Sequence, residues 1–248
     1  MAARVNGEGI LLSEYEAEMQ RYRSAREGSD EAYDAVQAKS DVLDYLFGQL
    51  LLAKSAADQG YSVDDAALVE RMNKFVEDIG SQETLDAWIE ENYFTKESFR
   101  TAVERDLSAL WMRDQILAGV PETAEQVHAR QILVRSETEA LAIESRLLAG
   151  VPFETIAFEY DPLTGGELGW FPRGYLLQTD VEQAAFSLEA GEISGRIQTS
   201  YGFHFVQVIE KDAAHSLSPD TLHFVQVNAL QTWLETKQAE SQIEILVP

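Results

Sequence analysis

Residues 127–134, VHARQILV, mark the point at which the pattern of this chain changes. The segment from His128 to Val134 has the composition of a strand. Ser136 and Glu139 follow at the spacing of a capping box, so we predict a helix that runs to Ala149. Strands and helices alternate from this point onward, which predicts a domain of mixed α and β structure.

Further short elements follow this first strand and helix. Proline and aspartate mark helix starts, and glycine-rich segments mark turns. The predicted elements are a helical stretch from Pro152 to about Tyr160, a strand entered from GGELGW, a helix capped by Asp180 that ends near Phe186, and two strands near Ile193–Gln198 and Phe203–Ile209. Four strands with segregated helices predict an α+β fold with a four-stranded antiparallel sheet.

The chain before this region is predicted to be helical up to about Gly119. Apolar residues recur there at helical spacing, and glycines stand where helices end. The predicted helices run from Ser13, capped together with Glu16, to Gly28; from near Asp30 to Gln59, with Val36, Leu43, Phe47 and Leu50 on one face; from a cap at Ser62 to Gly80; around Leu85–Ile89; and from Lys96 to Leu117. Together they form a mostly helical N-terminal module.

The composition of HSLSPD, residues 215–220, predicts a linker, and Asp220 is placed to cap one last helix. Because a lone helix cannot bury its own apolar stripe, we expect this helix to pack on the N-terminal helices. The sequence therefore predicts a helical module at 1–121, an α+β domain inserted at 122–213, and a linker and C-terminal helix at 214–248 that complete the helical module.

The charge and composition of the chain exclude several classes of partner. The sequence has 19 Lys and Arg against 43 Asp and Glu, a net charge of −24, which repels nucleic-acid phosphates and anionic lipid surfaces. There is no cysteine, which excludes disulfides and thiol catalysis. The four histidines lack the close spacing of zinc ligands, so we expect no metal and no other cofactor.

Hydropathy gives no signal for a membrane span. No run approaches the roughly 18 apolar residues that a span requires, and the opening residues lack the apolar core of a signal peptide. Met1-Ala2 directly ahead of ARVNGEGI is compatible with a start that follows a removed targeting segment. We therefore expect membrane attachment only through an anchor outside this sequence.

Four segments of the α+β region together resemble a known family. They are ARQILV, GGELGWF, AAFSLEAGEISG and TSYGFHFVQV. In this order and spacing, residues 123–212 resemble a parvulin-type peptidyl-prolyl isomerase domain. The opening RVNGEGILLSEYEAEM and the closing TWLETK and IEIL resemble the helical module of SurA-like and PrsA-like foldases. The resemblance implies an extracytoplasmic folding factor that binds unfolded or exported, proline-containing polypeptides and isomerises X-Pro bonds.

The resemblance also implies site residues. Parvulins line the proline slot with two histidines, a Cys or Asp, and a Met and Phe floor. The second histidine falls on His204, whereas Gln131 stands in place of the first, and Asp161 takes the place of the Cys or Asp in a shortened loop. The implied catalytic residues are Gln131, Asp161 and His204. The implied substrate-binding residues are Leu177 in place of Met, Val181 in place of Phe, and Phe186.

Each of these residues also has a simpler interpretation. Gln131 either hydrogen-bonds His204 and fixes one imidazole tautomer, or is a polar residue satisfied within the sheet. His204 is either a wall of the site or an ordinary strand residue. Because valine offers less apolar contact area than phenylalanine, Val181 predicts weak turnover. His128 lies off the motif position and is expected to be an ordinary strand residue.

Two other hypotheses compete with the isomerase. In the first, the helical module binds unfolded chains, and the α+β domain binds extended peptide without catalysing a reaction. The negative charge of the protein would then favour basic segments of the bound chain. In the second, the helical module is a dimeric scaffold that joins a second copy through LFGQLLL, residues 46–52. A buried central helix explains that apolar run equally well.

Overall fold

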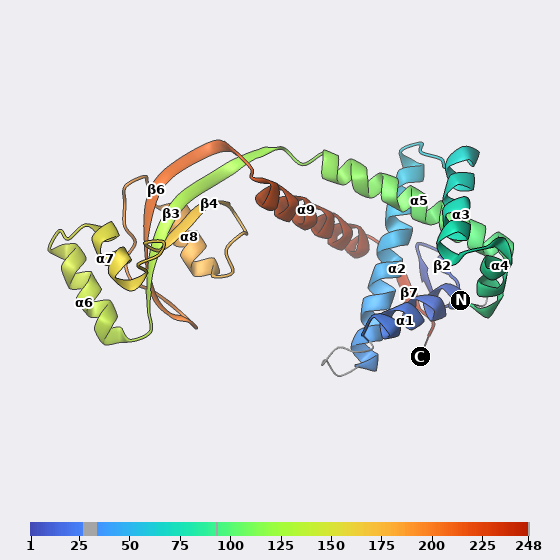
Figure 1. Cartoon of the computed structure of the whole chain (residues 1–248), viewed down its shortest axis with the longest axis horizontal. Helices are drawn as coiled ribbons and strands as arrows, with labels where there is room; N and C mark the ends of the chain where they lie inside the picture. Colours follow the sequence, from blue (N-terminus) through green and yellow to red (C-terminus); the bar gives the residue numbers. More distant parts are fainter. Residues whose placement is uncertain (27–33, 93, 248) are drawn as a thin grey trace. The chain divides into compact units, whose positions relative to one another are not determined.

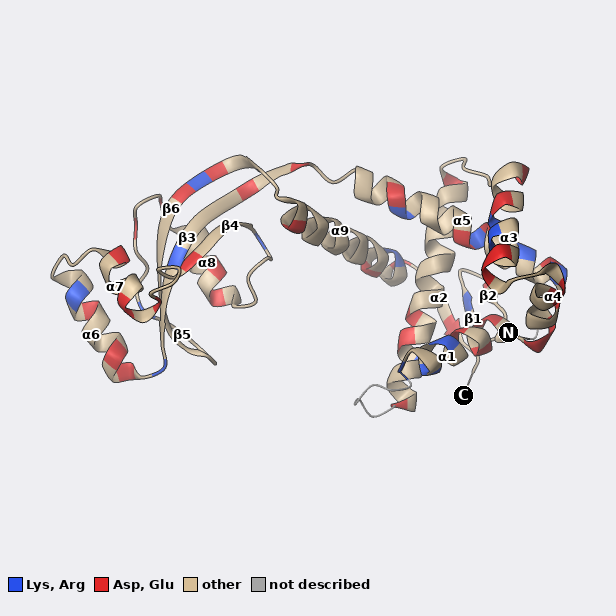
Figure 2. Cartoon of the chain, viewed as in Figure 1, with Lys and Arg blue, Asp and Glu red and all other residues tan. Residues whose placement is uncertain are grey.

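A computed structural model describes residues 1–26, 34–92 and 94–247 (Figure 1). The chain divides into two compact units. Unit 1 comprises residues 1–120 and 226–248, and unit 2 comprises residues 121–225. Acidic residues are spread over the helices and strands of both units, so the net charge of −24 is not confined to one of them (Figure 2).

Unit 2 contains the predicted four-stranded antiparallel sheet, so the α+β fold class is confirmed. The sheet order is β4-β3-β6-β5. Its elements are β3 (Thr123–Val134), α6 (Glu137–Leu148), α7 (Phe153–Tyr160), β4 (Glu167–Pro172), α8 (Thr179–Ser187), β5 (Ile197–Thr199) and β6 (Gly202–Ser216). Ser136 caps α6 as predicted, because its hydroxyl accepts from the Glu139 N–H.

Helices cover both faces of this sheet. On one face, Val181 and Phe186 of α8 pack with Val127 and Val208 of the sheet. On the other face, α6 and α7 pack on a second group of strand residues that includes Ile132 and Phe205. Because side chains alternate between the faces along a strand, β3 and β6 contribute to both clusters.

Several predicted boundaries in unit 2 are wrong. Residues 215–216 of the predicted linker belong to β6, where the buried Gln126 amide donates to both of their carbonyls at 2.9 and 3.3 Å. Ser218, not Asp220, caps the last helix, since its hydroxyl accepts from the Thr221 N–H. The predicted strand near Ile193 is reduced to one bridge before the short β5.

The predicted helix cap at Asp180 is also wrong. The cap position of α8 is Gln178, which makes no side-chain capping bond. The carboxylate of Glu182 instead reaches back and accepts from the N–H groups of Gly174 and Leu176, at 2.7 and 2.9 Å. This contact fixes the loop that precedes α8.

Unit 1 is mostly helical and carries a small sheet that the sequence analysis missed. Its helices are α1 (Leu12–Arg26), α2 (Ala35–Asp58), α3 (Asp65–Ile79), α4 (Gln82–Glu91), α5 (Lys96–Ala118) and the C-terminal part of α9 (Pro219–Ala239). The sheet has the order β2-β1-β7, with β1 at Ala3–Val5, β2 at Glu8–Ile10 and β7 at Ile243–Ile245. The prediction that this region is helical throughout is therefore wrong at its start.

A two-residue turn joins β1 to β2. Asn6 and Gly7 have φ values of 53° and 85°, as a type I′ turn requires. Asn-Gly between two short strands is a strong local signal for such a hairpin.

Three details of the predicted helices also differ. Ser13 lies inside the first turn of α1, where the Glu14 carboxylate accepts from the Leu11 N–H, and Asp64 rather than Ser62 caps α3. Val36, predicted to share one face of this helix with Leu43, Phe47 and Leu50, is 80% exposed, whereas those three side chains are buried. The predicted helix ends at Gly28 and Asp30 lie outside the described residues.

The C-terminal segment packs on the helices and the small sheet of unit 1. Leu230, Trp233 and Leu234 of α9 pack against a cluster that includes Leu52 of α2 and Met112 of α5, and β7 pairs with β1. Among the described residues, no helix combines the length and hydropathy that crossing a membrane demands.

The apolar run LFGQLLL is buried inside unit 1. The side chains of its apolar residues are each at most 5% exposed, and Leu234 of α9 lies against Gly48. The hypothesis that this run forms a dimer contact is therefore wrong, because its side chains already fill the core.

Candidate active site

Three polar side chains lie in a row across three strands of unit 2. His204 on β6 is paired with Ile197 on β5, and Gln131 on β3 is paired with Val206 on β6. His204 therefore has two diagonal neighbours, Gln131 on β3 and Thr199 on β5. Diagonal neighbours on one face of a sheet are close enough for their side chains to touch.

The three side chains form a continuous hydrogen-bond network. His204 Nδ1 lies 3.0 Å from Gln131 Oε1, and His204 Nε2 lies 2.8 Å from Thr199 Oγ1. Thr199 Oγ1 also accepts from the Tyr201 N–H at 3.1 Å. Because an amide oxygen can only accept, Nδ1 carries the proton and Nε2 of the neutral ring accepts from the Thr199 hydroxyl. The network thus selects one imidazole tautomer.

The surroundings of His204 favour the neutral ring. His204 is only 2% exposed, and this burial lowers its pKa. Desolvation disfavours the charged imidazolium, and no carboxylate is among its hydrogen-bond partners in the described residues. The ring therefore stays uncharged near neutral pH.

Asp161 organises a loop and does not contact His204 directly. Its carboxylate accepts from the N–H groups of Leu163, Thr164 and Gly166 and from the Thr164 hydroxyl. The hydrogen bond from the Thr164 hydroxyl is the main cause that holds the Asp161 pKa below its usual range. Its lone pairs are thus committed to the loop.

This loop packs directly against the strand that carries Gln131. The Gly166 carbonyl accepts from the Gln131 N–H at 2.7 Å. Gly166 has a φ of 72°, and a Cβ there would lie 1.8 Å from the Gln131 carbonyl oxygen. Asp161 is therefore connected to Gln131 through the backbone of Gly166.

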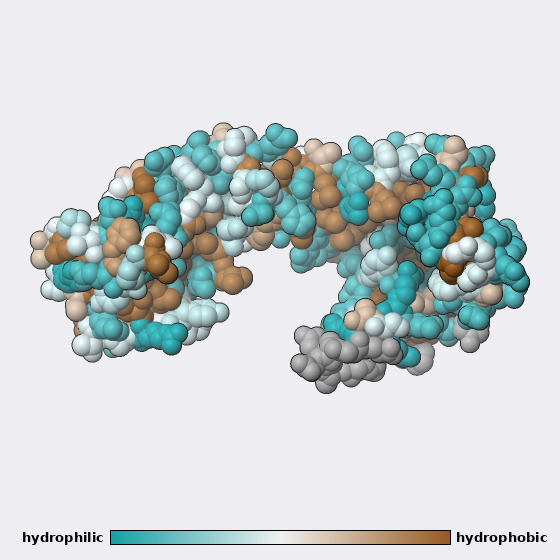
Figure 3. Space-filling view, in the orientation of Figure 1, coloured by the Kyte–Doolittle hydropathy of each residue, from teal (hydrophilic) through white to brown (hydrophobic). Residues whose placement is uncertain are grey.

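The three apolar site candidates differ in exposure. Leu177, in the loop before α8, is 91% exposed, whereas Val181 is 1% and Phe186 is 6% exposed. Phe186 packs edge-on against Phe171 and lies under the guanidinium of Arg173. Apolar side chains reach the surface around α8 and the loop before it (Figure 3). Of the three, Leu177 is the side chain that a ligand can reach without rearrangement.

His128 belongs to a different cluster. Its ring stacks on Trp170, whose other stacking partner is His215, and its Nε2 lies 2.6 Å from the Glu167 carboxylate. Within the described residues, no hydrogen bond links His128 to Gln131 or His204. His128 therefore does not substitute for the first histidine of the parvulin pair, whose position is occupied by Gln131.

Thr199 is the member of the network that the sequence analysis missed. It is the first residue of the TSYGFHFVQV segment, five positions before His204. The tight turn between β5 and β6 makes such a residue a diagonal neighbour of the histidine. The sequence did contain a signal for this contact. A residue with a hydroxyl group stands five positions before a strand histidine, and a turn containing glycine lies between them.

The comparisons with known proteins agree with this geometry. Residues 116–210 match the PPIC-type PPIASE domain, and residues 1–113 match the SurA-like N-terminal domain. The foldase protein PrsA of Caldanaerobacter subterraneus subsp. tengcongensis is 31% identical over 228 residues, which cover 84% of this chain and 72% of that protein. This chain belongs to the PrsA foldase family.

A second relative and one solved structure extend the comparison. The PrsA foldase of Geobacillus kaustophilus is 28% identical, over 76% of this chain and 69% of its own length. A crystal structure described as peptidylprolyl isomerase (PrsA) from Bacillus cereus aligns with a TM-score of 0.50 at 21% identity, over 82% of this chain and 80% of that one. The structural likeness concerns the fold. A PrsA-family chain with a parvulin-type domain thus carries the Gln131–His204–Thr199 network.

Proposed function

We propose that unit 2 catalyses cis–trans isomerisation of X-Pro bonds in exported polypeptides, and that unit 1 holds the same chains. The observation that carries the first proposal is the Gln131–His204–Thr199 network, which fixes a neutral imidazole beside a side-chain amide.

The proposed location is outside the cytoplasm, as in the extracytoplasmic foldases that the sequence resembles. Cell fractionation followed by immunoblotting tests this location.

The reaction requires no nucleophile and no base. The barrier of roughly 18 to 20 kcal/mol comes from amide resonance, so a catalyst must dehydrate the amide and place donors that favour the twisted state. The Oε1 atom of Gln131 accepts a hydrogen bond from His204, whereas the amide nitrogen of Gln131 donates to no group of the described residues. We assign this free N–H group to the carbonyl oxygen of the twisting bond.

The remaining site candidates take supporting roles in this proposal. Leu177 contacts the proline ring from the exposed loop, and Val181 and Phe186 form the packed floor beneath it. Asp161 holds the shortened loop against Gln131. Because the floor lies almost wholly in the core, the apolar contact with proline is small and turnover is expected to be slow.

The test is the exchange rate between cis and trans forms of a short X-Pro peptide, measured by NMR exchange spectroscopy with the full chain. We expect the full chain to accelerate exchange, and we expect Gln131→Leu to abolish the acceleration because it removes the free donor. Thr123→Val, at the exposed start of the same strand, is the control that leaves the network intact. No acceleration by the folded wild-type chain would refute the isomerase proposal.

A second candidate is a catalytically inactive peptide-binding domain. The burial of Val181 and Phe186 favours it, since only Leu177 of the three apolar candidates is exposed to a proline ring. Under this alternative the X-Pro peptide binds, and its NMR signals shift on titration, while the exchange rate stays at its uncatalysed value. Leu177→Ser is then expected to weaken peptide binding in the titration without changing the exchange rate.

Homodimer formation by the full chain stays a proposal that sedimentation tests.

A further inference from the structure

An open polar pocket of about 820 Å³ lies in unit 1. Its volume is in the range of typical ligand pockets. The lining comes from β2 and the start of α1, from α2 and the segment after it, and from α5. Its charged residues are Glu8, Glu14, Lys54, Glu97, Glu104 and Arg105. Hydroxyl and carboxylate groups dominate this lining.

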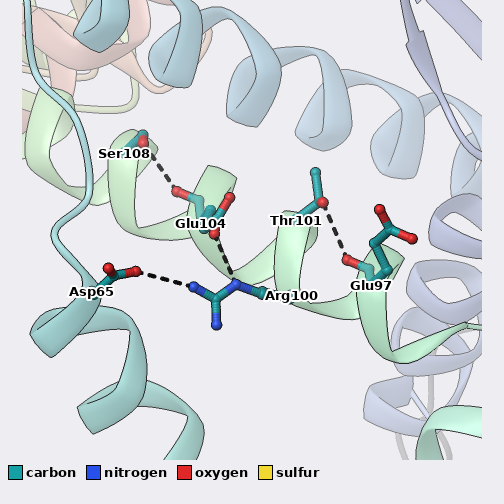
Figure 4. A network of polar contacts seen from close by, with 6 residues as sticks. All are labelled: Asp65, Glu97, Arg100, Thr101, Glu104 and Ser108. Carbon is teal, nitrogen blue, oxygen red and sulfur yellow. Dashed lines mark hydrogen bonds and ion pairs between the residues drawn. The ribbon is translucent and has the colours of Figure 1, made fainter.

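One face of α5 supplies a wall of this pocket. Glu97, Thr101, Glu104 and Ser108 follow one another along the helix (Figure 4). The hydroxyls of Thr101 and Ser108 donate to the backbone carbonyls of Glu97 and Glu104, at 3.1 and 2.9 Å. These bonds hold the short side chains against the helix, so that the carboxylates extend furthest from it.

Four carboxylates line the pocket against two cationic side chains, Lys54 and Arg105, so the charges of the pocket are only partly balanced. Glu14 is buried and paired with Arg105 at 2.7 Å, and Glu104 is paired with Arg100 at 3.2 Å. Glu8 and Glu97 have neither an ion pair nor a side-chain hydrogen bond to any described residue. These two carboxylates are therefore available to a cation that enters the pocket.

The free edge of β2 lies in the same pocket. Val5 and Glu8 flank the two-residue turn and form the hydrogen-bonded pair that closes the hairpin. In the next pair, Arg4 and Gly9, the backbone groups point away from the ladder that β1 and β2 share. Arg4 turns toward β7, where it is paired with Glu244, whereas no described strand pairs with the other edge of β2. The N–H and C=O of Gly9 thus face outward without a strand partner.

We propose that this pocket binds an extended polypeptide segment that carries lysine or arginine. The segment adds to the edge of β2 by hydrogen-bonding the N–H and C=O of Gly9, and its cationic side chain lies near Glu8 and Glu97. Strand addition supplies affinity through the main chain, and the side-chain pockets supply specificity. The inference rests on the proposed holding of polypeptides by unit 1 and is independent of isomerisation in unit 2.

The test uses the full chain and proline-free peptides, so that the site in unit 2 takes no part. Binding is measured by fluorescence anisotropy with two labelled peptides. One alternates threonine with lysine, and the other alternates threonine with glutamate. We expect the lysine peptide to bind and the glutamate peptide not to bind, with an affinity that falls as NaCl screens the charges. N-methylation of the peptide amides along one edge is expected to abolish binding, because it blocks pairing with Gly9.

Two sets of variants locate the site. Glu8→Gln and Glu97→Gln are each expected to weaken binding by roughly two- to five-fold, the range of an exposed ion pair. Glu90→Gln, on the exposed side of α4 and outside the pocket, is the matched charge control. Gly9→Pro removes the outward N–H and is expected to weaken binding by roughly three- to ten-fold.

Gly9→Ala is the control for the proline variant. Both variants add a Cβ that meets only the flexible end of the Met1 side chain, but alanine keeps the N–H. Equal weakening by Gly9→Ala and Gly9→Pro would overturn strand addition at this edge. Equal binding of the glutamate peptide, or equal inhibition by free spermidine at the same concentration as the lysine peptide, would overturn a cationic polypeptide as the occupant.

Discussion

Thr199 and His204 lie on neighbouring strands and share a hydrogen bond of 2.8 Å between the hydroxyl and Nε2. The bond spans the turn between β5 and β6, and the opposite ring nitrogen is held by Gln131. The imidazole is therefore fixed from both sides within a sheet that is covered by α8. Each of the two contacts is open to a separate test.

Thr199→Val is expected to destabilise unit 2 and to slow the proposed isomerisation. Valine has a similar shape but cannot donate, so Nε2 of the buried His204 loses its partner, at a cost of about 1 to 3 kcal/mol. Urea unfolding followed by tryptophan fluorescence measures the first effect, and NMR exchange spectroscopy measures the second. Thr123→Val, at the exposed start of β3, is the control and is expected to leave both values unchanged.

The stability of unit 2 is expected to depend on His204 below about pH 6.5, its pKa before folding. Burial lowers the His204 pKa in the folded state, so the unfolded chain binds the proton more readily. The contribution of the neutral ring is complete above the unfolded pKa and is lost as the pH falls toward the folded pKa. Urea midpoints measured between pH 5 and pH 7.5 test this expectation.

His204→Gln serves as the reference for this pH dependence. Glutamine keeps polar atoms at the site but does not titrate, so its urea midpoint is expected to change less with pH than that of the wild type. Carboxylates elsewhere titrate in both proteins and cancel in the difference. Parallel curves for the two proteins would contradict the assignment to His204.

Gly166→Ala is expected to destabilise unit 2 more than an ordinary glycine substitution at positive φ. The new Cβ would lie 1.8 Å from the Gln131 carbonyl oxygen, a backbone atom that cannot move without displacing β3. Gly150→Ala is the matched control, since Gly150 has a φ of 81° and open space around it, and its cost is expected to be about 1 kcal/mol. Similar unfolding midpoints for the two variants would show that the loop can move away from β3 at little cost in stability.

Local signals in the sequence were sufficient for most helices and for the sheet of unit 2. The spacing of apolar residues gave the helix from Lys96 to within one residue of its end, and Ser136 gave the start of α6. Where a cap was predicted from one residue alone, as at Ser62 and Asp220, a neighbouring side chain caps the helix instead, Asp64 in the first case and Ser218 in the second. The competition between nearby polar side chains depends on loop geometry, which a local pattern does not contain.

The site was predictable only as far as the motif reaches. Gln131 and His204 were placed together by the resemblance, and their 3.0 Å contact fits that placement. Thr199 was missed because its role depends on strand register across a turn. The bonding of Asp161 to its own loop also escaped the sequence, since it depends on which N–H groups converge on the carboxylate. Strand register across the β5–β6 turn and the closure of the Asp161 loop were thus the missing information.

Asp106→Asn is expected to stabilise unit 1 at neutral pH. Burial raises the pKa of Asp106, and this effect exceeds the opposing attraction of Arg105 and Arg21. A carboxyl whose folded pKa is raised favours folding when protonated, and this contribution is lost as the pH rises from the unfolded pKa through the folded pKa. Asparagine avoids the cost of burying the charge while keeping the size of the side chain.

The gain from this substitution is expected only where wild-type Asp106 is ionised. Urea unfolding followed by circular dichroism at pH 7 and pH 4 measures it, with a higher midpoint for the variant at pH 7 and a smaller difference at pH 4. Asp78→Asn, at an exposed pair with Lys74 on α3, is the control and is expected to give no gain at pH 7. A lower midpoint for Asp106→Asn at pH 7 would mean that the attraction of Arg105 and Arg21 outweighs the cost of burial. The carboxylate would then act as a stabilising partner of those arginines.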